Sequence, residues 1–280
     1  MYDGASRSDH LSAQRARGRL AIGFRCREAG KTALSRLYQQ GCLRARFPRP
    51  PAGEPPIAVL VNSSGGVAPG DRLEIAVSLE DGTAATIASQ AAERFYRAAP
   101  KSPPAHLRHH LSVGAGAALE WLPQETILFD RSALDRALTI DLAPDASVLA
   151  LEALVFGRHA MGEEVRSGFL RDRLSVRRAG CLMFEDTLRL EGPIAGMLDR
   201  PAIAAGARAL ATILHIGAPM NLDILRAALT LPFVEAGASV FDGLLLIRLA
   251  ARDGAALRTA LVAALAILRA ARPLPRVWLC

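Results

Sequence analysis

Short runs in which apolar and polar residues alternate dominate positions 18–190 of the chain. The clearest run is Asp71–Glu80, where every second residue from Leu73 to Leu79 is apolar and most residues between them are polar. Successive side chains of a strand point to opposite faces, so this run predicts a strand with one buried face. Asp81-Gly82 follows it, a dipeptide that favours a tight hairpin with a return strand over 83–90.

The same alternation predicts further strands, separated by turns at intervals of about eight to twelve residues, which is typical of antiparallel sheets. These strands cover 18–26, 31–38, 56–62, 106–113, 117–122, 134–142, 147–156, 168–178 and 181–190. The turns between them contain Ala29-Gly30, Gly114-Ala115-Gly116, Pro144-Asp145 and Ala179-Gly180.

Helical spacing appears only after about residue 200. Residues 219–229 begin with a proline and carry leucines at three- and four-residue steps, which predicts an amphipathic helix. A second helix is predicted over 255–271, ended by Pro273, and 238–250 between the two helices has the pattern of a strand. We therefore expect a mainly β fold, a large antiparallel strand-rich single domain with about two α-helices in its C-terminal third.

Composition excludes a membrane protein and a secreted disulfide-rich protein. The longest apolar stretch, Ala260–Leu268, has about half of the roughly 20 residues that a membrane span needs. The arginines near the N-terminus are not followed by an apolar segment, so no secretory signal is predicted and we expect a cytoplasmic location. The four cysteines are widely scattered, with no spacing typical of a disulfide framework or a zinc site.

The formal net charge of +7 is concentrated at one end of the chain. Residues 1–50 hold eleven Lys and Arg against three acids, a net charge of +8, so the rest of the chain sums to −1. No aromatic-interleaved motif accompanies this basic segment, so nucleic acid is not the expected partner. An acidic protein partner explains the charge equally well.

Two motif fragments that suggest an enzyme are incomplete. Gly30-Lys31-Thr32 ends like a phosphate-binding loop, but Arg25 stands where that motif needs its first glycine. Ser64 resembles the serine of a nucleophile elbow, but Asn62 replaces the first glycine and no helix is predicted to follow. We therefore expect no catalytic residues and no enzyme activity.

Histidines offer a second possible centre. On the predicted strand 106–113, His106 and His110 share one face and His109 points to the other, a pattern more typical of a solvated strand than of a metal site. His159 lies in a glycine-rich, charged loop after an apolar strand. A hydrolase that uses Glu152 and His159, with Asp130 as a further candidate, is the alternative to a non-enzymatic protein.

Carboxylates within apolar runs are the strongest chemical signal. Glu152 lies in the apolar run Val148–Phe156, and Glu185 and Asp186 interrupt the run Leu182–Leu190. A buried carboxylate needs a hydrogen-bond partner, a counter-charge or a metal ion, or it becomes neutral. Pairing with one of the many arginines is one interpretation, and a path of hard oxygen ligands for a divalent ion is the other.

Several phrases, taken together and in order, resemble one family. They are NSSGGVAPGD at 62–71, QAAERFYR at 90–97, LEWLPQE at 119–125, FGR at 156–158, MGE at 161–163, AGAS at 236–239 and LPRVWL at 274–279. This series resembles the urease accessory proteins UreD, also called UreH. The resemblance runs from about residue 16 to the C-terminus, which implies one UreD-like domain over 16–280. Residues 1–15 match no part of the family, and we expect them to be disordered.

The resemblance implies a strand-dominated accessory protein that binds apo-urease and UreF and, through UreF, the GTPase UreG. It also implies that such an assembly delivers nickel to the urease active site, and that nickel passes through the interior of the protein. Asp71, Glu152 and Glu185 stand at acidic positions of the family pattern and are the candidate metal ligands of that path. We expect no tightly bound cofactor, only transient Ni²⁺, and neither a nucleic acid nor a membrane as partner.

Overall fold

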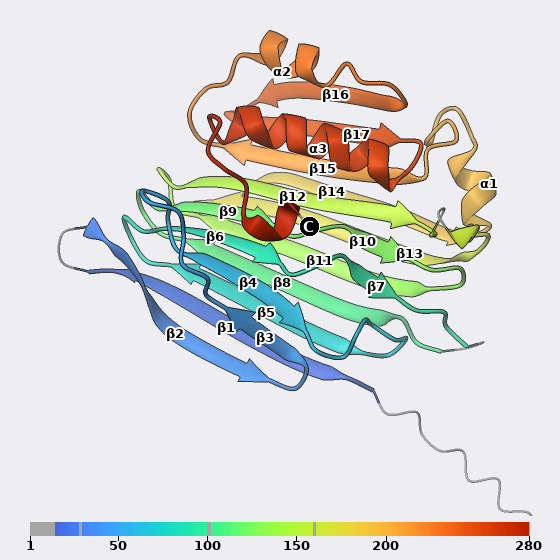
Figure 1. The fold of residues 1–280 in the computed structure, drawn as a ribbon, viewed down its shortest axis with the longest axis horizontal. Helices are drawn as coiled ribbons and strands as arrows, with labels where there is room; N and C mark the ends of the chain where they lie inside the picture. Colours follow the sequence, from blue (N-terminus) through green and yellow to red (C-terminus); the bar gives the residue numbers. More distant parts are fainter. Residues whose placement is uncertain (1–14, 28–29, 100–101, 159–160, 280) are drawn as a thin grey trace, which may run out of the picture.

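The computed structural model describes residues 15–27, 30–99, 102–158 and 161–279, which form two facing β-sheets with helices at one end (Figure 1). The strands of the seven-stranded sheet, in spatial order, are β14 (Cys181–Gly192), β13 (Gly168–Arg178), β11 (Ala133–Leu142), β8 (Ala105–Val113), β5 (Arg72–Leu79), β1 (Arg17–Cys26) and β2 (Thr32–Gln40). The ten-stranded sheet runs β16 (Val234–Phe241), β17 (Leu244–Ala251), β15 (Ala209–Ile216), β12 (Ser147–Phe156), β9 (Ala118–Leu122), β6 (Ala84–Ser89), β4 (Ile57–Asn62) and β3 (Leu43–Arg46). Two short strands, β7 (Glu93–Phe95) and β10 (Thr126–Leu128), pair beside β12.

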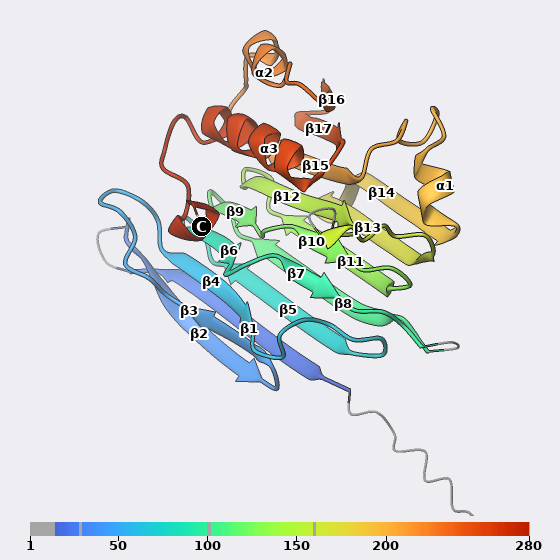
Figure 2. The ribbon, with the colours of Figure 1, turned by 45° about the vertical axis from the view of Figure 1, so that its right-hand side comes forward.

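The mainly β class is confirmed, but the pairing is mixed rather than antiparallel throughout. At the edges, β1 pairs with β2 and β13 with β14 as antiparallel hairpins, as expected. In the middle of both sheets the strands are parallel, including β5 with β8 and β6 with β9. The middle is parallel because the longer strands from β5 to β13, leaving aside the short β7 and β10, alternate between the sheets, so neighbours within one sheet run in the same direction (Figure 2).

The hairpin expected at Asp81-Gly82 is therefore wrong. β5 pairs with β1 and β8 in one sheet, whereas β6 pairs with β4 and β9 in the other. The turn bonds to the next turn of the chain instead of closing a hairpin, since Gly82 N donates to Ala115 O at 2.8 Å and Ala115 N donates to the Asp81 carboxylate at 2.8 Å. Turns stacked in this way carry the chain from sheet to sheet.

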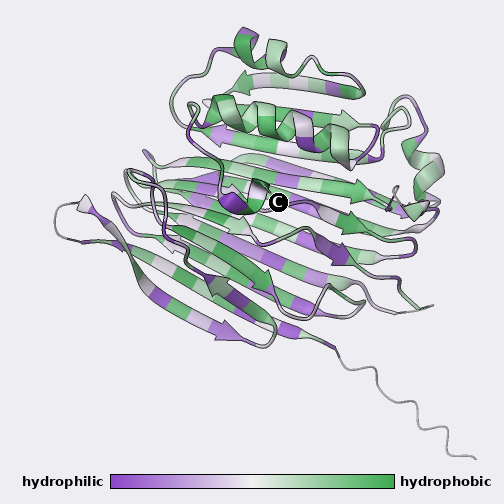
Figure 3. Cartoon of the chain, viewed as in Figure 1, coloured by the Kyte–Doolittle hydropathy of each residue, from purple (hydrophilic) through white to green (hydrophobic). Residues whose placement is uncertain are grey.

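The main hydrophobic core lies between the two sheets. Every second residue of β5 is buried, from Leu73 to Leu79, as is Phe24 of the neighbouring β1. The inward residues of the facing sheet include Trp121 and Phe156. The alternation of apolar and polar positions along each strand is visible in Figure 3. Burial of such side chains contributes about 1.5–3 kcal/mol each, so this layer is the principal source of stability.

Three α-helices occur in the described part of the C-terminal third, α1 (Ile194–Leu198), α2 (Leu222–Ala228) and α3 (Gly254–Leu268), and a short 3-10 helix, η3 (Arg276–Leu279), follows them. Both expected helices form, while α1 was not foreseen. α3 ends before the expected limit because Ala270 and Ala271 adopt positive φ angles of 49° and 59°. The expected strand 238–250 is instead the hairpin β16–β17.

A second apolar cluster lies on the other face of the ten-stranded sheet. There α3 buries Leu257, Leu261 and Leu265 against β15 and β17 (Figure 1). In the described residues, none of the helices is long and apolar enough to cross a membrane. The expectation of disorder for residues 1–15 falls outside the described residues, apart from Arg15.

Candidate functional site

A buried group of three charges lies between the sheets. Arg136 on β11 contacts Glu152 on β12 at 2.5 Å (Nη1 to Oε2) and Asp172 on β13 through Nε to Oδ1 at 2.8 Å and Nη2 to Oδ2 at 2.5 Å. Arg136 is 3% exposed and Glu152 is 8% exposed. Their positions follow from strand alternation, because each is in phase with buried leucines of its own strand. One cation and two carboxylates leave this group anionic when all three are ionised.

The protonation of this group is set by burial and by its own charges. Burial lowers the pKa of Arg136, but the Asp172 and Glu152 carboxylates outweigh burial and leave that pKa above its ordinary value. Burial raises the pKa of Glu152, and the nearby Asp172 adds to the rise while Arg136 opposes it. The guanidinium therefore stays charged, and burial works against the charge of Glu152.

Neutral side chains complete the surroundings of the group. Trp121 Nε1 donates to Glu152 Oε1 at 2.9 Å, and Arg136 Nη1 donates to Thr126 Oγ1 at 3.0 Å. The His109 ring lies 5.2 Å from the Trp121 ring, and its buried Nδ1 has no hydrogen-bond partner among the described residues. Burial, with Arg136 and Arg108 adding to it, lowers the pKa of His109 to about 3, so its imidazole is neutral.

Two cavities meet at Glu152. One has a volume of about 130 Å³ and is lined by Glu152 together with Arg136, Trp121 and His109. The other has a volume of about 470 Å³ and is lined by Glu152 and by acidic side chains of three other strands. These acidic residues are Asp172, Asp186 and Glu235. Glu152 thus lines both cavities, which we together call the polar space.

The motif segments 62–71 and 90–97 pack together at the smaller cavity. Val67 N donates to Arg94 O at 2.7 Å, and Tyr96 N donates to Val67 O at 2.9 Å. Asn62 Nδ2 donates to Glu93 Oε2 at 3.1 Å, and both side chains line the cavity. Burial raises the pKa of Glu93, and the bond from Asn62 opposes that rise.

Glycines at 65 and 66 allow this close packing. Tyr96 Oη donates to Gly65 O at 2.6 Å. Gly66 has a φ of 141°, and a Cβ atom there would lie 2.5 Å from the Tyr96 ring. Only glycine combines this backbone angle with such a short approach, so Gly66 of the first motif is required by the tyrosine of the second.

The motif 119–125 faces both sides of the ten-stranded sheet. Trp121 points inward to Glu152, whereas Glu120 and Leu122 point outward to the C-terminal segment. Trp278 Nε1 donates to Leu122 O at 3.0 Å, and Gln124 Nε2 donates to Val277 O at 2.7 Å. This motif thereby joins the interior group to the C-terminal segment.

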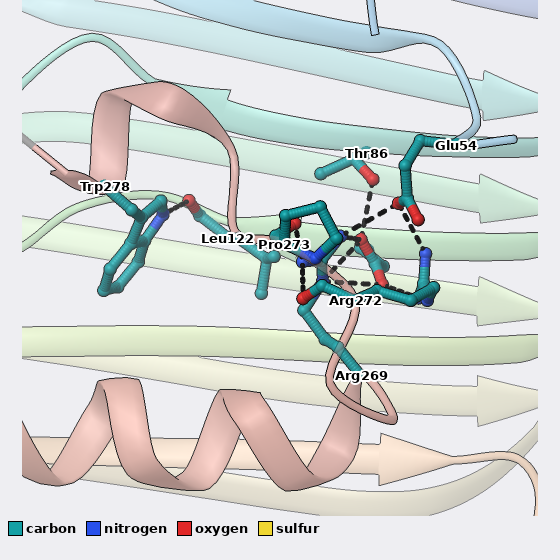
Figure 4. A network of polar contacts seen from close by, with 8 residues as sticks. Glu54, Thr86, Leu122, Arg269, Arg272, Pro273 and Trp278 are labelled. Atoms are coloured by element: carbon teal, nitrogen blue, oxygen red, sulfur yellow. Dashed lines mark hydrogen bonds and ion pairs between the residues drawn. The ribbon is translucent and has the colours of Figure 1, made fainter. Parts of the chain in front are cut away.

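An ionic network surrounds the outward carboxylate of Glu120, and Figure 4 shows its members Thr86, Arg269, Arg272 and Glu54 close together. Arg269 Nε lies 3.1 Å from Glu120 Oε1, Thr86 Oγ1 donates to Oε2 at 2.6 Å, and Arg272 bonds to Glu120 and to Glu54. Burial raises the pKa of Glu120, but Arg269 and Thr86 outweigh burial and leave that pKa below its ordinary value. The network fixes the chain just after α3.

The three acids expected to form a metal path lie in different surroundings. Glu152 is at the centre of the polar space. Asp71 is buried and accepts backbone N–H bonds from Ala16 and Ala68, each at 2.8 Å. Glu185 is exposed on the outer face of its sheet, whereas Asp186 next to it lines the larger cavity. Among the described residues, no group of three or more His, Cys, Asp and Glu is arranged to hold a metal ion.

Arg136 and Asp172 were missed from the sequence, although a signal was present. Each occupies an inward position of a predicted strand, between apolar residues two positions away on either side. A charge at such a position predicts a buried partner of opposite sign. Testing each inward charge for a partner would have identified both residues.

The residues of the hydrolase alternative do not gather into a described centre. Asp130 accepts backbone N–H bonds from Arg166 at 2.9 Å and Ser167 at 3.1 Å, a structural role in a loop. His159 lies outside the described residues. Ser64 donates to Asn62 Oδ1 at 2.6 Å, and its hydroxyl is engaged within its own turn.

Comparison with known proteins places these motifs in a family context. A family model described as UreD urease accessory protein matches residues 16–279. The urease accessory protein UreD of Azorhizobium caulinodans is 46% identical over 269 residues, covering 95% of this chain and 97% of that protein. The urease accessory protein UreD of Methylobacterium sp. is 45% identical over 272 residues, covering 95% of each chain. UreD 3 of Bradyrhizobium sp. is 44% identical over 273 residues, covering 97% of this chain and 96% of that protein.

Proposed function

Since the chain belongs to the UreD family of urease accessory proteins, we propose that it assists the delivery of nickel to the active site of urease. Its class is that of an accessory protein rather than an enzyme. One observation carries the proposal: Glu152 lies where two cavities meet, in a buried group with more negative than positive charge. The Ni²⁺ ion is here the cargo of the protein, not a resident cofactor.

The side chains that line the two cavities suit brief binding of a metal ion. Carboxylate oxygens are good ligands for hard and borderline divalent cations, and a neutral imidazole such as His109 adds a nitrogen donor. Arg136 keeps Asp172 and Glu152 occupied, so an entering cation must compete with a guanidinium for each carboxylate. Such competition favours brief binding and release over permanent retention.

Of the acids expected from the sequence, Glu152 carries the proposed path. Asp71 has both carboxylate oxygens engaged by backbone N–H groups, and Glu185 faces away from Asp186 across its strand. We extend the path from Glu152 to Asp172 and Asp186, which line the larger cavity with it. We keep Asp71 and Glu185 as proposed nickel ligands at the ends of the path.

The proposed partners are apo-urease, UreF and, through UreF, the GTPase UreG, within the cytoplasm. The GTPase activity is assigned to the partner, because Gly30-Lys31-Thr32 lies in and after the turn of the β1–β2 hairpin and not between a strand and a helix. The family membership supports these partners. Co-purification with UreF and the urease subunits tests them, and failure with every one of them would remove this part of the proposal.

The nickel path is tested with Glu152→Gln and Asp172→Asn. Each substitution keeps the shape of the side chain and removes its charge, so we expect urease matured with either variant to contain several-fold less nickel while the accessory complex still assembles. Glu191→Gln, at an exposed acid of the same sheet that has no place in the proposed path, is the matched control and should mature urease normally. Thermal unfolding verifies that each variant is folded. Full nickel content with both buried variants would overturn the proposed path.

A further inference from the structure

Two adjacent rows of charged side chains cross the outer face of the seven-stranded sheet. The register aligns the first row as Arg17, Arg72, His106, Asp135, Arg171 and Arg189. The second row, two residues further along each strand, aligns Arg19, Glu74, Arg108, Ala137 and Arg173. Their outward direction follows from the buried residues that alternate with them, such as Leu73 and Leu107. We call these two rows the basic band.

The basic band has a large excess of positive charge. It contains seven arginines and two carboxylates, a difference of five charges if His106 is neutral. Arg17 and Arg72 are directly opposite each other, and neither forms an ion pair with any residue that the structure describes. Like charges opposite each other in a sheet are destabilising, so an anion at this place would relieve an existing repulsion.

Within the band, three guanidiniums share one carboxylate. Asp135 is buried and lies 3.2 Å from Arg108 and 3.5 Å from Arg173, and it also bonds to Arg171. The Nε atoms of Arg171 and Arg173 are buried and have no hydrogen-bond partner among the described residues. A single carboxylate cannot satisfy three guanidiniums, and the side chains of Arg108, Arg171 and Arg173 are each 40% exposed, so their accessible nitrogens have donor capacity left for an external acceptor.

A groove on the same face gives such a ligand a place to lie. It has a volume of about 320 Å³ and runs beside the second row of the band. Ala21 and Ala76 are aligned in the register at its centre, while Arg36, Tyr38 and His110 stand around them. Small residues between larger cationic ones leave room for an extended chain close to the sheet.

We propose that the basic band and its groove form a docking site for an acidic segment of a protein partner. Paired oxygens of Asp and Glu side chains match the planar fork of arginine. Glu74 and Asp135, set among the arginines, would repel the continuous phosphates of a nucleic acid, whereas a protein segment can place a neutral or basic side chain against each of them. This inference does not depend on the proposed delivery of nickel.

Binding of fluorescently labelled poly-L-glutamate to the full chain tests the docking site. We expect Arg17→Gln/Arg72→Gln to weaken binding by about threefold to tenfold, because exposed charge pairs each contribute only modestly to binding. Neither arginine supports an ion pair among the described residues, so the double variant should keep its melting temperature. Arg46→Gln/Arg49→Gln removes the same charge from exposed positions on or next to β3 of the other sheet and should bind like the wild type.

Each outcome bears on the docking site directly. Weaker binding by the band variant alone supports it, whereas equal loss in both double variants would show that only net charge matters. Tighter binding of duplex DNA than of poly-L-glutamate, at equal charge and salt concentration, would overturn the assignment of a protein partner.

Discussion

At the scale of single residues, Arg136 has the greatest influence on the polar interior. Its guanidinium forms ion pairs with both Glu152 and Asp172 and so offsets the repulsion between these two carboxylates. Arg136→Met leaves two buried carboxylates without their counter-charge, so we expect the free energy of unfolding to fall by about 3–5 kcal/mol. Urea denaturation measures this loss. Arg46→Met, at an exposed position, should change stability by less than about 0.5 kcal/mol.

His109 predicts a particular dependence of stability on pH. Burial first, with Arg136 and Arg108 adding to it, lowers its pKa in the folded protein from 6.5 to about 3. Above pH 6.5 the ring is neutral in both states; between pH 6.5 and 3 the unfolded chain binds a proton that the folded chain does not. Stability therefore falls as the pH drops through this window, by up to about 1.4 kcal/mol per pH unit.

The variant His109→Phe removes this titration and should make the acid limb of a stability–pH curve shallower. Ser112→Ala, at an exposed position of the same strand, changes no titratable group, so it is the control and should leave the slope unchanged. Identical slopes for the wild type and His109→Phe between pH 4 and 6.5, chosen to lie within the window above, would contradict the assignment.

The sequence allowed part of the candidate site to be predicted at this scale. Glu152 stood out because it is an acid in an otherwise apolar strand. At Glu185 and Asp186 the sequence does not show which side chain points inward, because adjacent residues of a strand point to opposite faces and both residues are acids. The register settles it by pairing Asp186 with the inward Leu174 and Glu185 with the outward Ser175. Such a register depends on a partner strand and a bulge that alternation alone does not reveal.

At the scale of elements, the segment after α3 depends on Trp278. The ring is buried, its Nε1 bonds to Leu122 O, and the Arg258 guanidinium lies 4.2 Å above it. Trp278→Ala should lower the free energy of unfolding by about 3–5 kcal/mol, because it leaves a large cavity. Trp278→Phe keeps most of the apolar contact and loses the hydrogen bond, so we expect a loss of about 1 kcal/mol in the same denaturation experiment. Equal effects of the two substitutions would contradict a packing role.

Strands could be predicted from the sequence more fully than their partners. Alternation identifies which residues face the core, and β5, β8 and β12 lie where it placed them. It says nothing about which strand lies alongside, and Asp81-Gly82 is as suitable for a turn between sheets as for a hairpin. Short strands such as β7 and β10 were missed because three residues are too few to show a period.

At the scale of the whole molecule, β12 links the two apolar clusters. Its residues Val148 and Ala150 belong to the core between the sheets, whereas Leu149 and Leu151 pack toward the helices. Because one strand serves both clusters, we propose that residues 16–280 form one cooperative domain.

The two tryptophans allow this to be measured, because Trp121 is in the first cluster and Trp278 in the second. Fluorescence of the single-tryptophan variants Trp278→Phe and Trp121→Phe should report transitions that coincide with the circular dichroism transition of the same variant. Separate fluorescence and circular dichroism midpoints in either variant would divide the chain into two units.

The alternation of strands between sheets also has a consequence for biosynthesis. Neighbouring strands such as β5 and β8 are separated in the sequence by β6 and β7 of the other sheet, so few pairings are local and folding is expected to be slow. The Leu122 carbonyl accepts a hydrogen bond from Trp278, which is synthesised 156 residues later. Until the segment 269–279 has left the ribosome, the outward surface around Glu120 and Leu122 stays open on the growing chain. A nascent chain stalled at that stage is therefore where association with chaperones or with other copies is most to be expected.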